Sequence, residues 1–132
     1  MSAQFFDQNN DSNPYNGTVL IDGAAAKALL KSNVSNKPFF AELISDHQTK
    51  LLIGLGPKIA CAQFSTSNDD PPYLMASLES ERMQSGFAEF LIEGTPSEVP
   101  RRLCVPLSVL LDVAAHFVET GERSPIVDWE VI

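Results

Sequence analysis

The fold is decided by the C-terminal stretch Val105-Pro-Leu-Ser-Val-Leu-Leu-Asp-Val-Ala-Ala-His-Phe-Val-Glu-Thr-Gly-Glu-Arg-Ser-Pro-Ile-Val-Asp-Trp-Glu-Val-Ile132. Pro106 suits the first turn of a helix, where its missing N–H would have no partner in any case. Gly121 tolerates the left-handed backbone conformation that ends many helices. The stretch therefore predicts a helix of about 14 residues that stops at Thr120-Gly121.

This helix is amphipathic. Its apolar residues fall on one stripe, at Leu107, Leu110, Leu111, Ala114 and Val118. Its opposite side is polar, with Ser108, Asp112, His116 and Glu119. A single apolar stripe at helical spacing predicts that the helix packs along one side, here against a sheet.

The end of the chain has the alternation of a strand. Val127, Trp129 and Val131 share one side, while Asp128 and Glu130 lie on the other. This alternation predicts a closing strand with one buried face. We expect Trp129 to belong to the core rather than to a binding site.

The N-terminal region divides at Gly17. Residues 1–16 are rich in Gln, Asn, Asp and Ser, which predicts a mobile tail unless Phe5, Phe6 and Tyr15 anchor it. Residues 17–132 are predicted to form a single domain. It begins with a short strand over 18–21, and Asp22 then caps a helix over 23–31.

Further strands are predicted over 38–45, 49–55, 59–65, 73–79 and 86–93, with one more short strand over 99–105. Tight connections at 46–49 and 56–58 are typical of antiparallel neighbours. The predicted fold is α+β, with a mainly antiparallel twisted sheet of about five to seven strands. One helix from the N-terminal half and the C-terminal helix pack on one face, and the other face is left for water or a partner.

Composition narrows the possible functions. The formal net charge of -8 argues against direct nucleic-acid binding, since phosphate contact requires a basic surface. No basic start followed by an apolar run, and no stretch of membrane-spanning length, is found, so we expect a cytoplasmic protein without membrane contact. Cys61 and Cys104 lie in separate apolar runs, which indicates two buried thiols rather than a redox or zinc motif.

The strands over 73–79 and 86–93 each have a mixed second side. If they pair as a hairpin, that side presents aromatic, methionine and carboxylate groups over about 1,000 Å² or less, the size of a partner patch. Residues 66–98 also hold seven acidic residues against the single Arg82, and thus six of the eight net negative charges. The predicted partner-binding residues are Asp69, Asp70, Tyr73, Met75, Glu79, Glu81, Phe87, Glu89 and Glu93.

Two interpretations of this acidic region stay open. It is either a solvated surface or a charged decoy for the basic cleft of a partner that grips nucleic acid. In the second case charge would raise the association rate, while Tyr73, Met75 and Phe87 would be the apolar anchors.

Catalytic and cofactor sites have weak support. Ser45, Asp46 and His47 are sequential neighbours in a predicted turn, a placement that rarely supplies the geometry of a hydrolytic triad. Gly54-Leu-Gly56 lacks the following helix of a dinucleotide site, and two histidines without clustered spacing do not indicate a metal. We expect no enzyme activity, no cofactor and no metal.

The helix, the Thr120-Gly-Glu-Arg123 turn and the terminal Trp129-Glu130 together resemble the C-terminal part of immunity protein family 1. Leu51-Leu-Ile-Gly-Leu-Gly56 and the apolar run over 58–64 resemble the middle of that family, so the likeness spans about two thirds of the chain. The resemblance implies a cytoplasmic bacterial antitoxin that binds one cognate toxin of a polymorphic toxin system. Such toxins are often nucleic-acid deaminases or other enzymes that act on nucleic acid.

Two functions follow as hypotheses. The first is an immunity protein that forms a one-to-one complex with a toxin domain and occludes its active site. The alternative is a non-enzymatic acidic adaptor or regulatory domain that binds another protein through the same surface. The sequence leaves homo-oligomerisation undecided, because an exposed hairpin could pair with a second copy.

Overall fold

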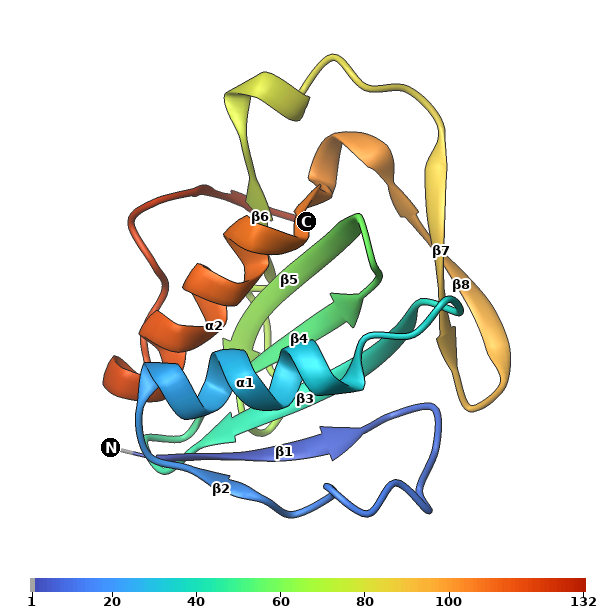
Figure 1. Cartoon of the computed structure of the whole chain (residues 1–132). Coiled ribbons are helices and arrows are strands. Elements are labelled where there is room, and N and C mark those ends of the chain that lie inside the picture. The colour runs from blue at the N-terminus through green and yellow to red at the C-terminus, as the bar shows by residue number, and fades with distance from the viewer. Residues whose placement is uncertain (1) are drawn as a thin grey trace.

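A computed structural model describes residues 2–132 and has an α+β architecture (Figure 1). Its sheet runs in the order β10-β6-β5-β4-β3-β1-β2, with neighbours antiparallel throughout. These strands are β1 (Ala3–Asp7), β2 (Val19–Leu20), β3 (Phe39–Ser45), β4 (Thr49–Leu55), β5 (Ile59–Thr66), β6 (Leu74–Ser77) and β10 (Asp128–Val131). The predicted α+β class with a mainly antiparallel sheet is confirmed.

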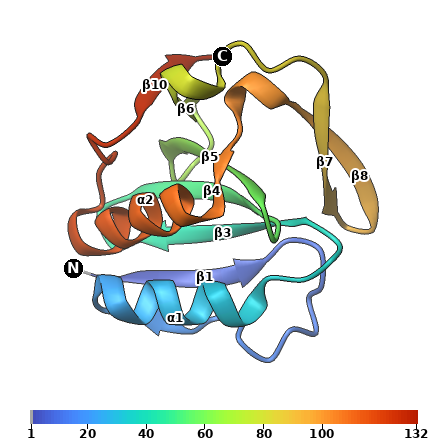
Figure 2. The same ribbon diagram turned by 45° about the horizontal axis from the view of Figure 1, so that its top comes forward.

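Both helices lie side by side on one face of this sheet, α1 (Gly23–Asn33) and α2 (Leu107–Thr120) (Figures 1 and 2). Helix α2 has 14 residues, as its apolar periodicity predicts. It ends at Gly121, whose φ of 71° is left-handed and whose N–H donates to the Phe117 carbonyl. Within the described residues, no helix is long and apolar enough to cross a membrane.

Helix α1 begins where the sequence predicts. The Asp22 carboxylate accepts a hydrogen bond from the Ala25 N–H at 2.7 Å and so caps the helix. Two polar contacts then join α1 to α2. Glu119 accepts from the Gly23 N–H at 2.8 Å, and Lys27 pairs with Asp112 at 2.6 Å.

The helices seal a core of aliphatic and aromatic side chains. Its largest fully buried members include Phe5, Leu30, Leu43, Ile53, Leu110 and Phe117. Phe64 packs edge-on against both Phe117 and Trp129, with ring centroids 6.2 and 6.3 Å away. Trp129 is half-buried against this core, as predicted, and its indole N–H donates to the Ser124 carbonyl. Each such buried side chain contributes about 1.5–3 kcal/mol relative to an exposed one.

The N-terminus corrects the expectation of a mobile tail. Strand β1 pairs with β3 along its whole length, and Phe5 is fully buried in the helix-side core. Phe5 therefore provides the anchor that the sequence left as an alternative. Beyond β1, Asp7 accepts hydrogen bonds from the backbone N–H groups of Asn9 and Asn10, so the polar composition builds a turn here.

The expected hairpin between the strands over 73–79 and 86–93 is wrong. Strand β6 lies between β5 and β10, while β7 (Phe87–Ile92) pairs with β8 (Thr95–Pro100). The segment between them contains the 3₁₀ helix η1 (Glu79–Glu81) and is long enough to carry β7 away from β6. The strand expected over 99–105 is also interrupted, by the 3₁₀ helix η2 (Arg101–Leu103) before the short β9 (Val105–Pro106).

The β7–β8 hairpin covers part of the sheet face opposite the helices, which we call the second face. A separate core forms beneath it from Phe40, Cys61, Met75, Phe90, Val99, Leu103 and Cys104. Phe40 and Phe90 pack with ring centroids 5.3 Å apart. The second face is therefore only partly left for water or a partner, contrary to the prediction of an open face.

Candidate partner-binding site

The predicted partner-binding residues do not form one patch on a single hairpin. Asp69, Asp70 and Tyr73 belong to the loop between β5 and β6, and Glu79 and Glu81 to η1. The hairpin β7–β8 carries Phe87, Glu89 and, at its turn, Glu93. All of these except Met75 have side chains that are exposed or half-exposed.

Met75 is corrected from an exposed anchor to a core residue. Its exposed fraction is 6%, and it packs with the apolar residues beneath the β7–β8 hairpin. The alternation predicted for β6 is present, since Met75 and Ala76 face opposite sides of the sheet. Met75 is nevertheless buried, because the β7–β8 hairpin covers the side of the sheet that the sequence predicts to be open.

Asp69 is already engaged within the chain. Its carboxylate pairs with the Lys50 ammonium, which also binds Glu42 at 3.1 Å. Burial acts to lower the pKa of Lys50, but the Asp69 and Glu42 carboxylates outweigh burial and raise this pKa. The Tyr73 hydroxyl donates to the Asp69 carbonyl, so the loop is fixed by its own polar groups.

The outer side of the β7–β8 hairpin is exposed and acidic. Glu89 lies directly opposite Glu98 in the strand register, and among residues 2–132 neither carboxylate has an ion-pair partner. Like charges placed opposite one another destabilise a strand pair. Next to them, Phe87 is 62% exposed and lies opposite Pro100. This side thus has an apolar end beside an unneutralised pair of carboxylates.

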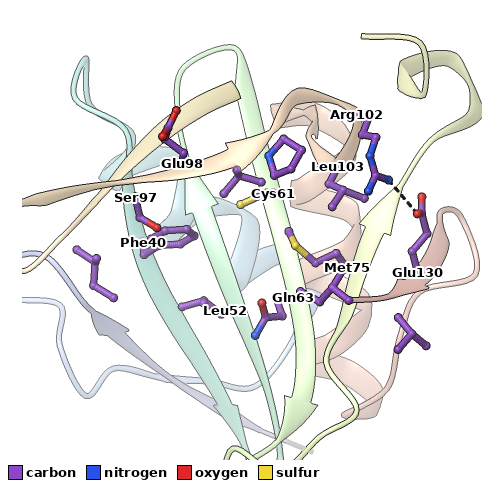
Figure 3. Close-up of a pocket in the computed structure, with 15 residues that line it drawn as sticks. Phe40, Leu52, Cys61, Gln63, Met75, Ser97, Glu98, Arg102, Leu103 and Glu130 are labelled. Carbon is purple, nitrogen blue, oxygen red and sulfur yellow. Dashed lines mark hydrogen bonds and ion pairs between the residues drawn. The ribbon is translucent and has the colours of Figure 1, made fainter. Parts of the chain in front are cut away.

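A cavity of about 540 Å³ opens on the second face between the hairpin and the C-terminal strand, and we call it the apolar pocket (Figure 3). Its apolar lining includes Phe40, Leu52, Cys61, Met75, Ile92 and Leu103. On the β10 side its rim carries Arg102 and Glu130, whose side chains pair at 3.0 Å. The Ser77 hydroxyl first, and then Arg102, lowers the pKa of Glu130.

A second cavity, of about 840 Å³, lies on the same face and is called the acidic pocket. Its lining is Phe6, Asp7, Gln8, Asn9, Asp11, Asn16, Glu42, Ile44 and Glu93. The sequence prediction includes Glu93 but not the others: those before Gly17 fall in the predicted tail, and Glu42 and Ile44 lie on the polar side of β3, which has no distinguishing signal. The signal that could have placed the residues before Gly17 is Phe5 and Phe6, which mark a strand within the predicted tail.

The turn at Ser45, Asp46 and His47 uses its polar groups for structure. The buried Ser45 hydroxyl accepts from the His47 and Thr49 N–H groups and contacts the Thr49 hydroxyl at 2.7 Å. The Ser2 N–H is the main group that lowers the pKa of Asp46. These contacts close a β-turn, which accounts for all three residues without catalysis.

The remaining reactive groups are two thiols, Cys61 and Cys104. Both are free and buried, as predicted. Burial raises the pKa of Cys104 to about 11 and that of Cys61 still further, so both are protonated near neutral pH. In the described part of the chain, no group of three or more His, Cys, Asp or Glu side chains is placed to hold a metal ion.

The family model of Immunity protein Imm1 matches residues 21–131 of the chain, from the residue after β2 to the last residue of β10. No curated protein matches the chain. The matched range contains the sheet from β3 onward, both helices and the hairpin, but not β1 or the turn that lines the acidic pocket.

Proposed function

This chain belongs to the Imm1 family of immunity proteins, and we propose that it neutralises its cognate toxin by covering a basic active site with an acidic surface. The family match over residues 21–131 is the observation that carries the proposal. Family membership supplies the immunity role and a toxin as the partner. The chemistry of the toxin and the mode of inhibition are the proposed parts.

The charge of the chain supports a toxin that acts on nucleic acid, such as a deaminase. Enzymes that hold nucleic acid need basic clefts, and this chain has a net charge of -8. Its exposed carboxylates offer a basic cleft a substitute for phosphate. Such complementarity speeds association, and desolvated apolar side chains then slow dissociation.

Eight of the predicted residues remain as proposed contacts, and Met75 is withdrawn because it is buried. Phe87 is the best-placed apolar anchor; Glu89 is two residues from it on β7, and Glu93 lies at the turn at the other end of the hairpin. Asp69 contributes less, since Lys50 already neutralises it. The remaining proposed contacts are Asp70, Tyr73, Glu79 and Glu81.

The proposed complex is one-to-one, forms in the cytoplasm and requires no catalysis by this chain. Inhibition is then steric, and an excess of immunity protein over toxin abolishes toxin activity. An acidic adaptor would also bind a basic protein, but it would not abolish a toxin's activity at stoichiometric amounts.

The test is a calorimetric titration with the C-terminal toxin domain encoded immediately upstream, at low and moderate salt, with toxin activity assayed on the same samples. We expect tight one-to-one binding and complete loss of toxin activity. The double reversal Glu89→Lys/Glu93→Lys should weaken binding and reduce its salt dependence.

The matched control is Asp112→Lys/Glu122→Lys, which changes the net charge equally on the α2 side at the cost of one exposed ion pair. It should bind nearly as well as the wild type. Unchanged toxin activity with a saturating amount of wild-type protein would refute the immunity mechanism proposed for this pair.

A further inference from the structure

We propose that the apolar and acidic pockets form one trough, which receives a protruding toxin segment that carries a large apolar side chain beside a lysine or arginine. The inference rests on the proposed function and adds where the partner enters and what chemistry it brings. Glu93 lines the trough, whereas Phe87 and Glu89 on the outer side of the hairpin line neither pocket, so Glu89→Lys alone tests the outer side independently of the trough.

The register of the sheet joins the two pockets. Glu42 lines the acidic pocket, Leu52 lines the apolar pocket, and the two residues are directly opposite on β3 and β4. Cross-strand partners point to the same face and lie about 5 Å apart. At the hairpin, Ile92 lines one pocket and its neighbour Glu93 the other. No element therefore separates the two cavities.

Two exposed carboxylates at the acidic end have no ion-pair partner among the described residues. Within residues 2–132, Asp11 and Glu93 are exposed and make no ion pair, while Glu42 shares Lys50 with Asp69. No Lys or Arg lines this pocket. An incoming guanidinium or ammonium group would thus meet uncompensated negative charge and free oxygen acceptors.

The apolar end is a pocket with a preformed floor. Phe40, Met75 and Leu103 are buried at its base, while Leu52 and Ile92 remain half-exposed within it. Covering the half-exposed groups with an apolar side chain would remove them from water, which favours binding. A volume of about 540 Å³ is enough for a large side chain and the backbone next to it.

The trough is held in shape by bonds between the N-terminal turn and the hairpin. Asn9 accepts from the Gly94 N–H at 2.8 Å, and the Gln8 carbonyl accepts from the Glu93 N–H at 3.1 Å. Asn16 accepts from the Asp7 N–H at 2.6 Å. Such preorganisation lowers the entropy lost on binding. The part of the acidic end that residues 6–16 line lies outside the range matched to the family, so this part does not follow from family membership.

Charge decides between the possible occupants. A second copy of this chain also carries a net charge of -8, and pairing two such surfaces would oppose association. A segment of a basic toxin that carries an apolar side chain beside a lysine or arginine complements both the apolar end and the acidic end of the trough. Phe40 and Glu42 lie two residues apart on β3, about 7 Å, so an extended segment fits if its apolar and basic residues have the same spacing.

The acidic end is tested with Asp11→Lys, by titration with the same upstream-encoded toxin domain. We expect at least tenfold weaker binding at low salt and a smaller loss at high salt, because salt screens an exposed charge. The matched control Glu122→Lys makes the same charge change in the turn after α2 and should stay within about twofold of wild type.

The apolar end is tested with Leu52→Gln, which keeps the size of the side chain. We expect at least tenfold weaker binding that is independent of salt, because the lost contact is apolar. The control Ile21→Gln alters an exposed apolar residue between β2 and α1 that lines neither pocket, and it should change affinity less than twofold. If Leu52→Gln lowers the melting temperature too far, Ser97→Trp fills the same pocket from its half-exposed rim and serves instead.

The outcomes separate this inference from the proposed function. Wild-type affinity in Asp11→Lys and Leu52→Gln, together with lost binding in Glu89→Lys, overturns the trough and leaves the immunity role intact. No binding by the wild type overturns both. Loss of self-association in the trough variants, measured by sedimentation without toxin, would show that a second copy is the occupant and would also overturn the inference.

Discussion

The two faces of the sheet use the same strands and differ in almost everything else. On the helix side, β3, β4 and β5 present Leu43, Ile53 and Ala62, all fully buried under α1 and α2. On the second face, the same strands present Glu42, Leu52 and Gln63, which are half-exposed beside a short hairpin. We call the helix side the sealed face, because its side chains are fully covered. The second face keeps the apolar and acidic pockets.

The difference follows from what covers each face. Two helices joined by the Gly23–Glu119 and Lys27–Asp112 contacts can span the sheet and exclude water from it. A two-stranded ribbon is narrower, and it covers only the part of the second face near Phe40. The sheet must then carry polar groups on the uncovered part. Stability and partner binding are thereby assigned to opposite faces.

The largest expected effect comes from breaking the sealed face. Phe117→Ala removes a fully buried ring that packs on Phe64, and we expect a loss of about 3–5 kcal/mol in the free energy of unfolding, measured by urea denaturation. Toxin affinity, measured at a temperature where the variant remains folded, should not change. The ring lies far from the surface proposed to bind.

Leu52→Ala on the second face is the matched comparison. Leu52 is half-exposed, so its truncation should cost about 1–2 kcal/mol, since only part of its surface is withdrawn from water. Toxin binding should nevertheless fall. If Leu52→Ala costs as much stability as Phe117→Ala, or if Phe117→Ala reduces affinity while folded, the division of roles between the faces is wrong.

A loss of stability smaller than that of Phe117→Ala is expected where the hairpin meets the sheet. A Cβ atom added at Gly54 would lie 2.7 Å from both the Cys61 sulfur and the Phe90 ring. Gly54→Ala should therefore displace the hairpin and cost about 1–3 kcal/mol through overpacking. Because the hairpin is one wall of the trough, toxin affinity should fall as well. Thermal denaturation and titration would measure the two effects.

The double variant Gly54→Ala/Phe90→Leu tests whether the Phe90 ring limits the space at Gly54. In it, a smaller and more flexible side chain faces the added methyl group. A double-mutant cycle should show that Phe90→Leu costs less in the Gly54→Ala background than alone. Additive costs would mean that Phe90 is not what limits the space at Gly54, and that the hairpin is held by other contacts.

The sealed face could be predicted from the sequence, because its signals are local. The periodicity over 107–120 and the caps at Asp22 and Gly121 act within a few residues, and all three are confirmed. Strands β3, β4 and β5 are joined by short turns, which fixes their neighbours. A local pattern suffices when chain connectivity leaves one way to pair.

The second face could not be predicted, because its organisation depends on pairings between distant segments. Strand β1 joins β3 across α1, and β7 leaves β6 for β8, so adjacency along the chain was misleading. The predicted exposure of Met75 is wrong for the same reason, since Met75 is buried by the β7–β8 hairpin, with which its own strand does not pair. The carboxylates at Asp11 and Glu42 have no distinguishing sequence signal until folding brings them together.

The smallest expected effect concerns Glu130 at the rim of the apolar pocket, where the Ser77 hydroxyl and Arg102 lower the pKa of the carboxyl below its ordinary 4.5. Ser77 is fully buried, and among the described residues its hydroxyl makes no hydrogen bond, so it acts on Glu130 as a dipole from the neighbouring strand, where Ser77 pairs with Asp128. Ser77→Ala should therefore raise this pKa, and by more than the control Arg102→Gln, as followed by carboxyl NMR titration. A folded-state pKa below the unfolded value stabilises the fold above the unfolded pKa, and this contribution is lost as pH falls through the folded pKa. Ser77→Ala should reduce this pH-dependent contribution to stability. Stability at neutral pH does not measure the reduction, because the substitution also removes an unsatisfied buried hydroxyl. An unchanged Glu130 pKa in Ser77→Ala, with a raised one in Arg102→Gln, would assign the perturbation to the ion pair alone.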